Sequence, residues 1–485
     1  MAVLAALAGT SAALYYSNLG LSLSHYDARA HLVVARRILD SLTPGWQQIG
    51  AVWLPLPHVL NMLPVQVDAW YRTGASGIAI SVAAMALGAG SLAALLLRAT
   101  GSVPAAAAGG VLLLANPNVL YLQSTPMTEP LLFGLSLFAA ATVAAWLDRF
   151  EPTGPAPAST LAGVALVAAC MTRYEAWPIT GAMLVIALAV LIRRGVALRP
   201  AFQAVARLAA GPIVAIVVFS MNSRWVVGEW FVSGGFFVAE NVEAIGRPLV
   251  AWRQVREGLA DLSGPMSTCS GYFGVALVAW TFVRSQRRAS LAVLVALFAA
   301  AALPVAAYVE GHPLRIRYAL PLVIAGAATA SAGIAVLWRP LQWIAAAVVL
   351  PVTLLQSWPI DHTAPLVLES QRETANMIGR RAITAYLQEH YDGAPIMMSM
   401  GSLGHYMHDL SLAGFDLKVF LHEGMGEIWT FAMLQPRNHS GWLVIEGSAE
   451  GGDALHHASL RARWLEGFEQ VAEGGGARLY RASAR

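Results

Sequence analysis

Residues 26–61 read YDARAHLVVARRILDSLTPGWQQIGAVWLPLPHVLN and directly follow the first apolar run of the chain. The stretch combines one early acid, Asp27, with arginines, aromatic residues and prolines. A carboxylate at the edge of the hydrocarbon is costly to desolvate. A functional role or an ion-pair partner therefore explains this acid better than packing does. Asp27 is therefore the first candidate for a functional residue.

The composition predicts a polytopic membrane protein. Of the 485 residues, 57% are hydrophobic and 12% are charged, and the mean hydropathy is +0.58. Apolar runs long enough to cross a hydrocarbon core of about 30 Å lie near residues 1–20, 75–97, 103–122, 130–147, 157–171, 176–192, 203–221, 268–283, 289–308, 318–337 and 340–357. We therefore expect an all-α membrane domain over residues 1–358, with about eleven transmembrane helices in the cell inner (plasma) membrane.

The acidic residues predict the orientation. If the amino terminus is cytoplasmic, eleven acids fall in the outer loops of the membrane domain and two in the inner loops. The arginines divide about evenly, so the positive-inside rule does not decide. The outer face is thus the expected location of a catalytic or binding site. The net charge is only +3, without a basic tail or patch, so nucleic acid is not a predicted partner.

The last part of the chain has a different composition. Residues 359–485 hold a normal mixture of polar and apolar residues and predict a soluble α/β domain, which the span count places outside the cytoplasm. TANMIGRRAITAYLQEHY has helical periodicity, and APIMMSM and GWLVIEG are typical of buried strands. FEQVAEGGGARLYRA predicts a hairpin around a glycine turn.

Several motifs lie at the outer ends of spans. Residues 25–40 predict an amphipathic helix on the membrane surface, and WLPLPHVLNMLPVQ predicts a proline-broken element buried in protein. Polar clusters follow at residues 125–129, 172–175 and 310–318. Carboxylates and arginines that meet at this depth could bind a phosphate and activate a hydroxyl. The structural alternative is that Glu129 and Glu175 pair with a nearby arginine, and that Arg315 and Arg317 are interfacial anchors.

No metal site is predicted from spacing. The segment GHYMHDL and the pair His422 and Glu423 hold metal-binding residue types, but no HExxH-type spacing occurs. Two cysteines also exclude a multi-cysteine metal site.

The motifs together resemble the bacterial membrane glycosyltransferases of the GT-C superfamily. An acid in the first external loop, the WLPLPH element, PMTEP, TRYEAWP and RIRYALPL occur in the order seen in family 39 and protein O-mannosyltransferase-like enzymes, which are similar in plan to the lipid A aminoarabinose transferases. The resemblance implies transfer of a hexose or pentose from a polyprenyl-phosphate donor to a lipid, glycan or protein acceptor on the outer face, with inversion, in contact with membrane lipid.

The resemblance also assigns roles to residues. Asp27 and Glu129 match the catalytic acids, with Asp27 expected to act as the general base. The expected substrate-binding residues are His31, His58, Arg173, Glu175, Arg315, Arg317 and Tyr318. The first loop departs from the family pattern, because a single Asp replaces an acidic pair. The sequence therefore does not decide whether a divalent cation takes part.

Two other classes of function remain open at the level of sequence. A transporter or lipid flippase would also have many spans, but no internal repeat is visible and the charges gather at one face instead of the midplane. A non-catalytic assembly subunit is the second alternative.

Overall fold

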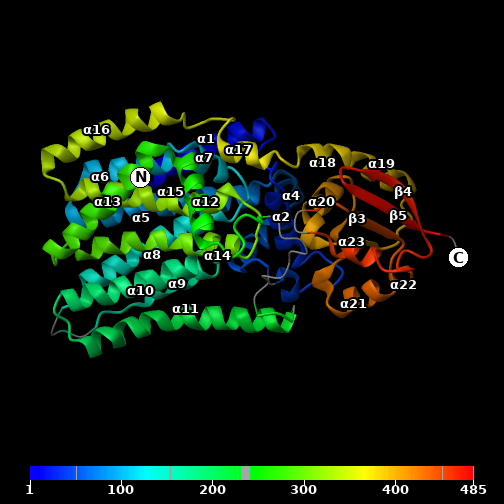
Figure 1. Cartoon of the computed structure of the whole chain (residues 1–485), viewed down its shortest axis with the longest axis horizontal. Coiled ribbons are helices and arrows are strands. Elements are labelled where there is room, and N and C mark those ends of the chain that lie inside the picture. Colours follow the sequence, from blue (N-terminus) through cyan, green and yellow to red (C-terminus); the bar gives the residue numbers. More distant parts are fainter. Residues whose placement is uncertain are drawn as a thin grey trace.

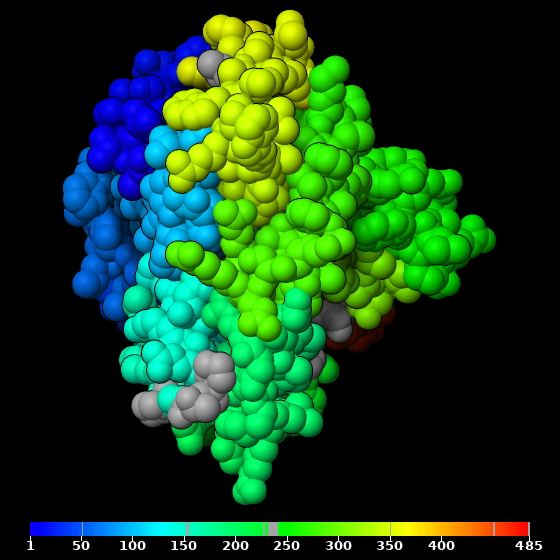
Figure 2. All heavy atoms as spheres, turned by 90° about the vertical axis from the view of Figure 1, so that its left-hand side faces the viewer, coloured from blue at the N-terminus to red at the C-terminus, as the bar shows by residue number. Residues whose placement is uncertain are grey.

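The computed structural model describes residues 1–50, 52–151, 154, 156–226, 228–230, 241–449 and 452–483. The chain forms a long helical bundle with a smaller α/β domain at one end (Figure 1). A view from the other end shows almost only the helices of the bundle (Figure 2). The predicted fold class, an all-α polytopic membrane domain followed by an α/β domain, is confirmed.

The elements of the first part are α1 (Ala2–Asn18), α2 (Tyr26–Arg37), η1 (Trp46–Ile49), α3 (Leu56–Asn61), η2 (Pro64–Gln66), α4 (Asp68–Thr73), α5 (Ala75–Thr100), α6 (Val103–Leu114), α7 (Pro117–Leu122), α8 (Glu129–Asp148), α9 (Thr160–Cys170), α10 (Ala176–Arg193), α11 (Leu198–Val226), α12 (Pro248–Ser263), α13 (Pro265–Arg284), η3 (Ala289–Ala301), α14 (Ala302–Val309), η4 (Ile316–Ala319), α15 (Leu320–Val336), α16 (Arg339–Gln356) and α17 (Pro365–Ser370).

The number of long apolar helices is smaller than predicted. Within the described part of the chain, seven helices are long and apolar enough to cross a membrane, against about eleven expected. The other predicted runs are also helical but do not meet this criterion. The run at 103–122 breaks because the Asn116 side chain accepts hydrogen bonds from the N–H groups of Asn118 and Val119 and starts a new helix, α7. The helices α1 and α9 have only 17 and 11 residues.

Glycines let two pairs of helices approach closely. A Cβ atom at Gly134 in α8 would lie 2.1 Å from the carbonyl oxygen of Ala84 in α5. One at Gly274 in α13 would lie 2.2 Å from the carbonyl oxygen of Thr329 in α15. Small residues at such crossings are typical of helices in lipid, which associate through close packing. The crossings set the positions of α8 and α15, whose first turns hold or adjoin predicted site residues.

The helix α2 lies between the bundle and the C-terminal domain (Figure 1). Leu32 and Val33 belong to the apolar core of that domain, whereas Ala28 packs in the core of the bundle. Ten of its twelve residues are buried. The predicted position on the membrane surface is therefore wrong, because protein covers α2 on both sides. Its amphipathic pattern reflects contact with a second domain.

The remaining elements belong to the C-terminal domain: α18 (Thr374–Gly379), α19 (Arg381–His390), β1 (Ile396–Met398), α20 (Met400–Leu412), η5 (Leu417–Val419), β2 (Phe420–Leu421), η6 (Glu423–Met425), α21 (Glu427–Leu434), α22 (Pro436–His439), β3 (Trp442–Glu446), α23 (Ala454–Ser459), β4 (Phe468–Gly474) and β5 (Ala477–Ala482).

These strands form one five-stranded sheet in the order β2-β1-β3-β5-β4. The strands β2, β1 and β3 are parallel, and β5 and β4 run antiparallel as a hairpin. Gly475 and Gly476 have φ angles of 56° and 77°, which the tight turn of this hairpin requires. The predicted strands and hairpin are confirmed. The predicted boundary at residue 358 stays a prediction, and α17, beyond it, packs Leu366 and Val367 into the core of the bundle.

Candidate functional site

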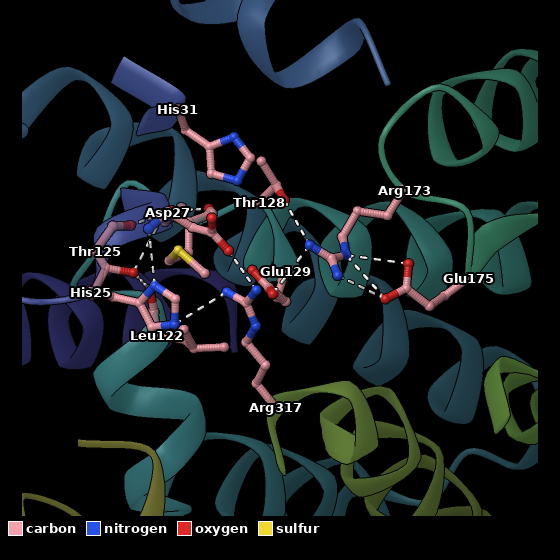
Figure 3. A network of polar contacts seen from close by, with 12 residues as sticks. His25, Asp27, His31, Leu122, Thr125, Thr128, Glu129, Arg173, Glu175 and Arg317 are labelled. Carbon is pink, nitrogen blue, oxygen red and sulfur yellow. Dashed lines mark hydrogen bonds and ion pairs between the residues drawn. The ribbon is translucent and has the colours of Figure 1, made fainter. Parts of the chain in front are cut away.

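Predicted site residues from distant segments meet where the bundle faces the C-terminal domain (Figures 1 and 3). They are Asp27 and His31 on α2, His58 on α3, Glu129 at the start of α8, Arg173 and Glu175 before α10, and Arg315, Arg317 and Tyr318 at η4. The convergence predicted for the ends of these spans is thus present in the fold.

An ion pair joins Asp27 to Arg317. Arg317 Nη2 donates to Asp27 Oδ2, and both residues are buried, at 9% and 4% exposure. Burial alone would raise the pKa of the Asp27 carboxyl, but the Arg317 guanidinium, the largest of several opposing causes, helps to hold this pKa below its usual range. Asp27 is therefore ionised in this state, and it is a weak base as long as Arg317 holds it.

A second arginine lies between two acids. Arg173 Nη1 is 3.1 Å from Glu129 Oε1, and Arg173 Nη2 is 2.8 Å from Glu175 Oε1. Arg173 also donates to Thr128 Oγ1 at 3.0 Å (Figure 3). Glu129 is 1% exposed, and neither of its carboxylate oxygens makes a hydrogen bond of normal geometry within the described residues. Unused acceptors on a buried acid are costly, so Glu129 is equipped to receive donor groups of a ligand.

Two histidines form a hydrogen-bonded chain. His58 Nδ1 lies 3.2 Å from the Leu54 carbonyl oxygen, which can only accept, so Nδ1 carries the proton. His58 Nε2 is then an acceptor for His31 Nδ1, 3.1 Å away. This order leaves His31 Nε2 as a second acceptor. Burial lowers the pKa of both imidazoles, so both are neutral at pH 7. The helix α3 ends before Pro64, as the predicted proline-broken element requires.

The predicted site did not include three neighbouring residues. His25 Nδ1 accepts from the Asp27 N–H at 3.1 Å and so caps α2. The Tyr26 ring lies 5.8 Å from the Arg315 guanidinium carbon. Glu369, at the end of α17, is buried beside η4, and burial raises the pKa of its carboxyl. The first two adjoin Asp27 in sequence. Glu369 lies beyond the predicted domain boundary and gave no such signal.

Among the described residues, the side chains of the site do not form a preformed metal site. Within the part of the chain that the structure describes, no three His, Cys, Asp or Glu side chains gather as ligands would. Asp27 and Glu129 each face a guanidinium, which supplies the positive charge at these carboxylates. Asp409 of the segment GHYMHDL accepts from Arg29 instead, at 2.7 and 2.8 Å.

Comparison with known proteins identifies the fold. No protein-family model and no curated protein sequence matches the chain. The crystal structure of ArnT from Cupriavidus metallidurans bound to undecaprenyl phosphate superposes with a TM-score of 0.60 and 13% sequence identity, covering 97% of both chains. The chain has the ArnT fold. The apo structure of ArnT gives a TM-score of 0.58 at 14% identity, covering 97% of this chain and 96% of ArnT. The GT-C resemblance seen in the sequence is confirmed at the level of the fold.

Proposed function

We propose that the chain is an integral membrane glycosyltransferase that moves a sugar from a polyprenyl-phosphate donor to an acceptor hydroxyl. The observation that carries the proposal is a buried acid paired with an arginine, Asp27 with Arg317, at the end of an ArnT-like bundle. The ArnT structure with undecaprenyl phosphate supports a donor of this class. The sugar is a hexose or pentose, and the acceptor is a lipid, glycan or protein.

The cationic side of the site is suited to the phosphate. Arg317 presents paired donors to phosphate oxygens, and Arg315 adds charge beside it. In the transfer, the acceptor O–H bond breaks and its oxygen bonds to the anomeric carbon. The bond from that carbon to the phosphate oxygen breaks, and its electron pair leaves with the phosphate. Arg317 stabilises the negative charge of the departing group.

Asp27 is the proposed proton acceptor, and Arg317 controls its basicity. Without donor, the guanidinium neutralises the carboxylate and lowers its pKa. A bound phosphate competes for the same guanidinium and adds negative charge near Asp27, and both effects raise this pKa. The acid then takes the hydroxyl proton as the bond to the sugar forms. Attack from the side opposite the phosphate inverts the anomeric centre.

An in-vitro transfer assay tests the function. The purified protein is incubated with labelled polyprenyl-phosphate sugars and with candidate lipid, glycan and protein acceptors. We expect labelled product from the wild type and a strong loss with Asp27→Asn. In proteoliposomes, a flippase would move the labelled lipid across the bilayer without forming product, and an assembly subunit would do neither. Either result would contradict the proposal.

We also propose that the site and the C-terminal domain lie outside the cytoplasm, because the acids of the predicted loops gather on that side. A reporter that is active only in the periplasm should give signal when fused after the last residue. Signal only from a reporter that is active in the cytoplasm would place the reaction on the inner face.

A further inference from the structure

One helix of the C-terminal domain, α21, carries apolar residues on both of its sides. Its sequence EIWTFAML contains a single charged residue, Glu427, in the first turn. On one side, Ala432 is buried in an apolar core of the domain. On the other side, Ile428, Phe431 and Leu434 are exposed. A helix that is apolar all round is normally covered on all sides, and the domain covers α21 on one side only.

The exposed apolar residues of this domain are concentrated on α21. The described residues after residue 370 include six exposed large apolar side chains, and three of them lie on this eight-residue helix. Their spacing of three residues makes Ile428, Phe431 and Leu434 neighbours on the helix surface. Single exposed apolar residues are normal, whereas a contiguous apolar patch marks contact with a protein or a membrane. We therefore asked which of the two lies within reach of α21.

The carboxyl end of α11 marks the level at which a candidate span leaves the hydrocarbon. α11 lies at the edge of the bundle, and its residues Val217, Val218 and Met221 are exposed (Figure 1). The next residues, 222–224, are polar, and Trp225 after them is exposed. Polar residues and an exposed Trp at the end of an apolar helix are typical of the headgroup region of a bilayer.

Two hydrogen bonds place the start of α21 near this level. Trp46 Nε1, in η1, donates to Asn222 Oδ1 at 3.1 Å. Two residues later, Gln48 Nε2 donates to the Gly424 carbonyl oxygen at 3.0 Å. α21 begins at Glu427, and three residues of chain span at most about 10 Å. Figure 1 accordingly shows α21 on the side of the C-terminal domain where α11 ends.

We propose that the exposed side of α21, the Ile428–Phe431–Leu434 face, binds the surface of the lipid bilayer beside the end of α11. Interfacial helices lie with their apolar side about 5–10 Å below the headgroups. α21 contains no Lys or Arg, so the contact depends on apolar burial and does not require anionic lipid. The face would hold the C-terminal domain against the membrane. The inference is independent of the proposed reaction.

The size of the face favours lipid over a second copy of the chain. Its three side chains are 39–66% exposed. Even at the roughly 250 Å² of a large aromatic side chain, three half-exposed side chains offer at most about 400 Å². A stable interface between two proteins buries about 800 Å² on each partner. A bilayer has no such minimum, and it already surrounds the neighbouring helix α11.

Lipid-attached quenchers test the contact in the full chain. The protein carries Cys269→Ser, which removes the exposed cysteine and leaves the buried Cys170, and it is placed at one copy per nanodisc of phosphatidylcholine. A fluorophore is attached at Thr430→Cys, which lies beside the face and keeps its three apolar side chains. Nitroxides on the headgroup or at the start of the acyl chain should quench this label. Nitroxides at the chain end should not, because an interfacial helix reaches only about 5–10 Å deep.

Two controls accompany the measurement. The same label at Gln470→Cys, on the exposed edge strand β4 farther from the bundle in Figure 1, should not be quenched. Phe431→Ser/Leu434→Ser in the Thr430-labelled protein should remove most of the quenching without lowering the unfolding temperature, because both side chains are exposed. An unquenched label at Thr430, equal quenching at both positions, or quenching that survives the double substitution would each overturn the proposal. A label that becomes shielded only when a disc holds two copies would assign the face to a second copy and overturn it as well.

Discussion

Two ion pairs join α2 to its two neighbours, and they differ in what surrounds them. Asp27 and Arg29 are two positions apart, so their side chains leave the helix about 200° apart. Asp27 meets Arg317 of the bundle, and Arg29 meets Asp409 of the C-terminal domain. Arg29 Nη1 donates to both oxygens of Asp409, which is 22% exposed. Around Asp27 lie Glu129, whose carboxylate is paired with Arg173, and the acceptor nitrogen of His31.

The comparison shows that an ion pair alone does not mark a site. The Arg29 and Asp409 pair closes a domain interface, and Arg29 Nε and Nη2 are buried there without hydrogen-bond partners among the described residues. The Asp27 and Arg317 pair instead stands beside a second group of acids and an arginine, Glu129, Arg173 and Glu175. Acids and arginines gathered at one place are what a phosphate-bearing substrate can use. The Arg29 and Asp409 pair should therefore matter mainly for stability, and the Asp27 and Arg317 pair mainly for activity.

The largest expected effect is on catalysis at Asp27. Asp27→Asn keeps the shape and one acceptor oxygen but removes the basicity, so kcat for sugar transfer should fall at least about a hundredfold. Binding of polyprenyl phosphate should persist. The matched change at the other pair, Asp409→Asn, should keep transfer within a few-fold of wild type. Near-normal transfer by Asp27→Asn would make Asp27 a structural partner of Arg317 only.

The next effect is on donor binding. Arg317→Ala removes a charge-assisted contact worth about 1.5–3 kcal/mol, so the affinity for polyprenyl phosphate should fall about 10- to 150-fold. Arg317→Lys should restore part of it, because an ammonium cannot reproduce the paired donors. Arg98→Ala is the control, since Arg98 pairs with Asp148 away from the site, at 3.4 Å. An unchanged dissociation constant for Arg317→Ala would remove this arginine from the phosphate site.

The third effect is on the domain interface. Arg29→Met keeps much of the apolar length but leaves Asp409 without its partner, so the free energy of unfolding should fall by about 1–3 kcal/mol. Faster limited proteolysis between the two domains should accompany it. The double variant Arg29→Met/Asp409→Leu should recover most of the loss, because no charge is then left unpaired. A double variant as unstable as the single one would show that packing of Arg29, not its charge, holds the interface.

The sequence predicted the convergence of these residues better than it predicted their surroundings. Asp27, Glu129 and Arg317 all stand at the ends of apolar runs, and span ends at one face must share a depth, so their meeting followed from topology. The burial of α2 could not be predicted from the sequence. An amphipathic helix that packs against a second domain has the same pattern of polar and apolar residues as one that lies on a membrane. Glu369 was missed because its approach to η4 depends on how α17 folds back onto the bundle.

Counting apolar runs by their length also did not reveal where a helix is interrupted inside a run. Asn116 ends α6 through side-chain hydrogen bonds to α7, yet a hydropathy window averages over a single Asn. The proton order of the His31 and His58 pair needed the structure as well, since it depends on the Leu54 carbonyl that His58 contacts.

A third buried ion pair joins Arg380 to Glu446 inside the C-terminal domain. We expect a substitution in this pair to have the smallest effect on stability, and we expect that effect to depend on pH. Burial raises the pKa of Glu446 from 4.5 to about 7, against the opposing charge of Arg380. The folded domain therefore holds this proton more tightly than the unfolded chain. The resulting stabilisation is complete below about pH 4.5 and is lost as the pH rises through 7.

Glu446→Gln tests whether ionisation of Glu446 destabilises the domain, because an amide resembles the protonated acid. The variant should match the wild type at pH 5 and be more stable at pH 8, by roughly 1–2 kcal/mol after allowance for partial solvent screening. Thermal unfolding of the full chain, followed by far-UV circular dichroism at several pH values, measures the difference. A variant that is less stable than the wild type at pH 8 would mean that the ionised pair with Arg380 stabilises the domain. Glu446 would then resemble Asp409, an acid that is held by its arginine, and not a group whose ionisation weakens the fold.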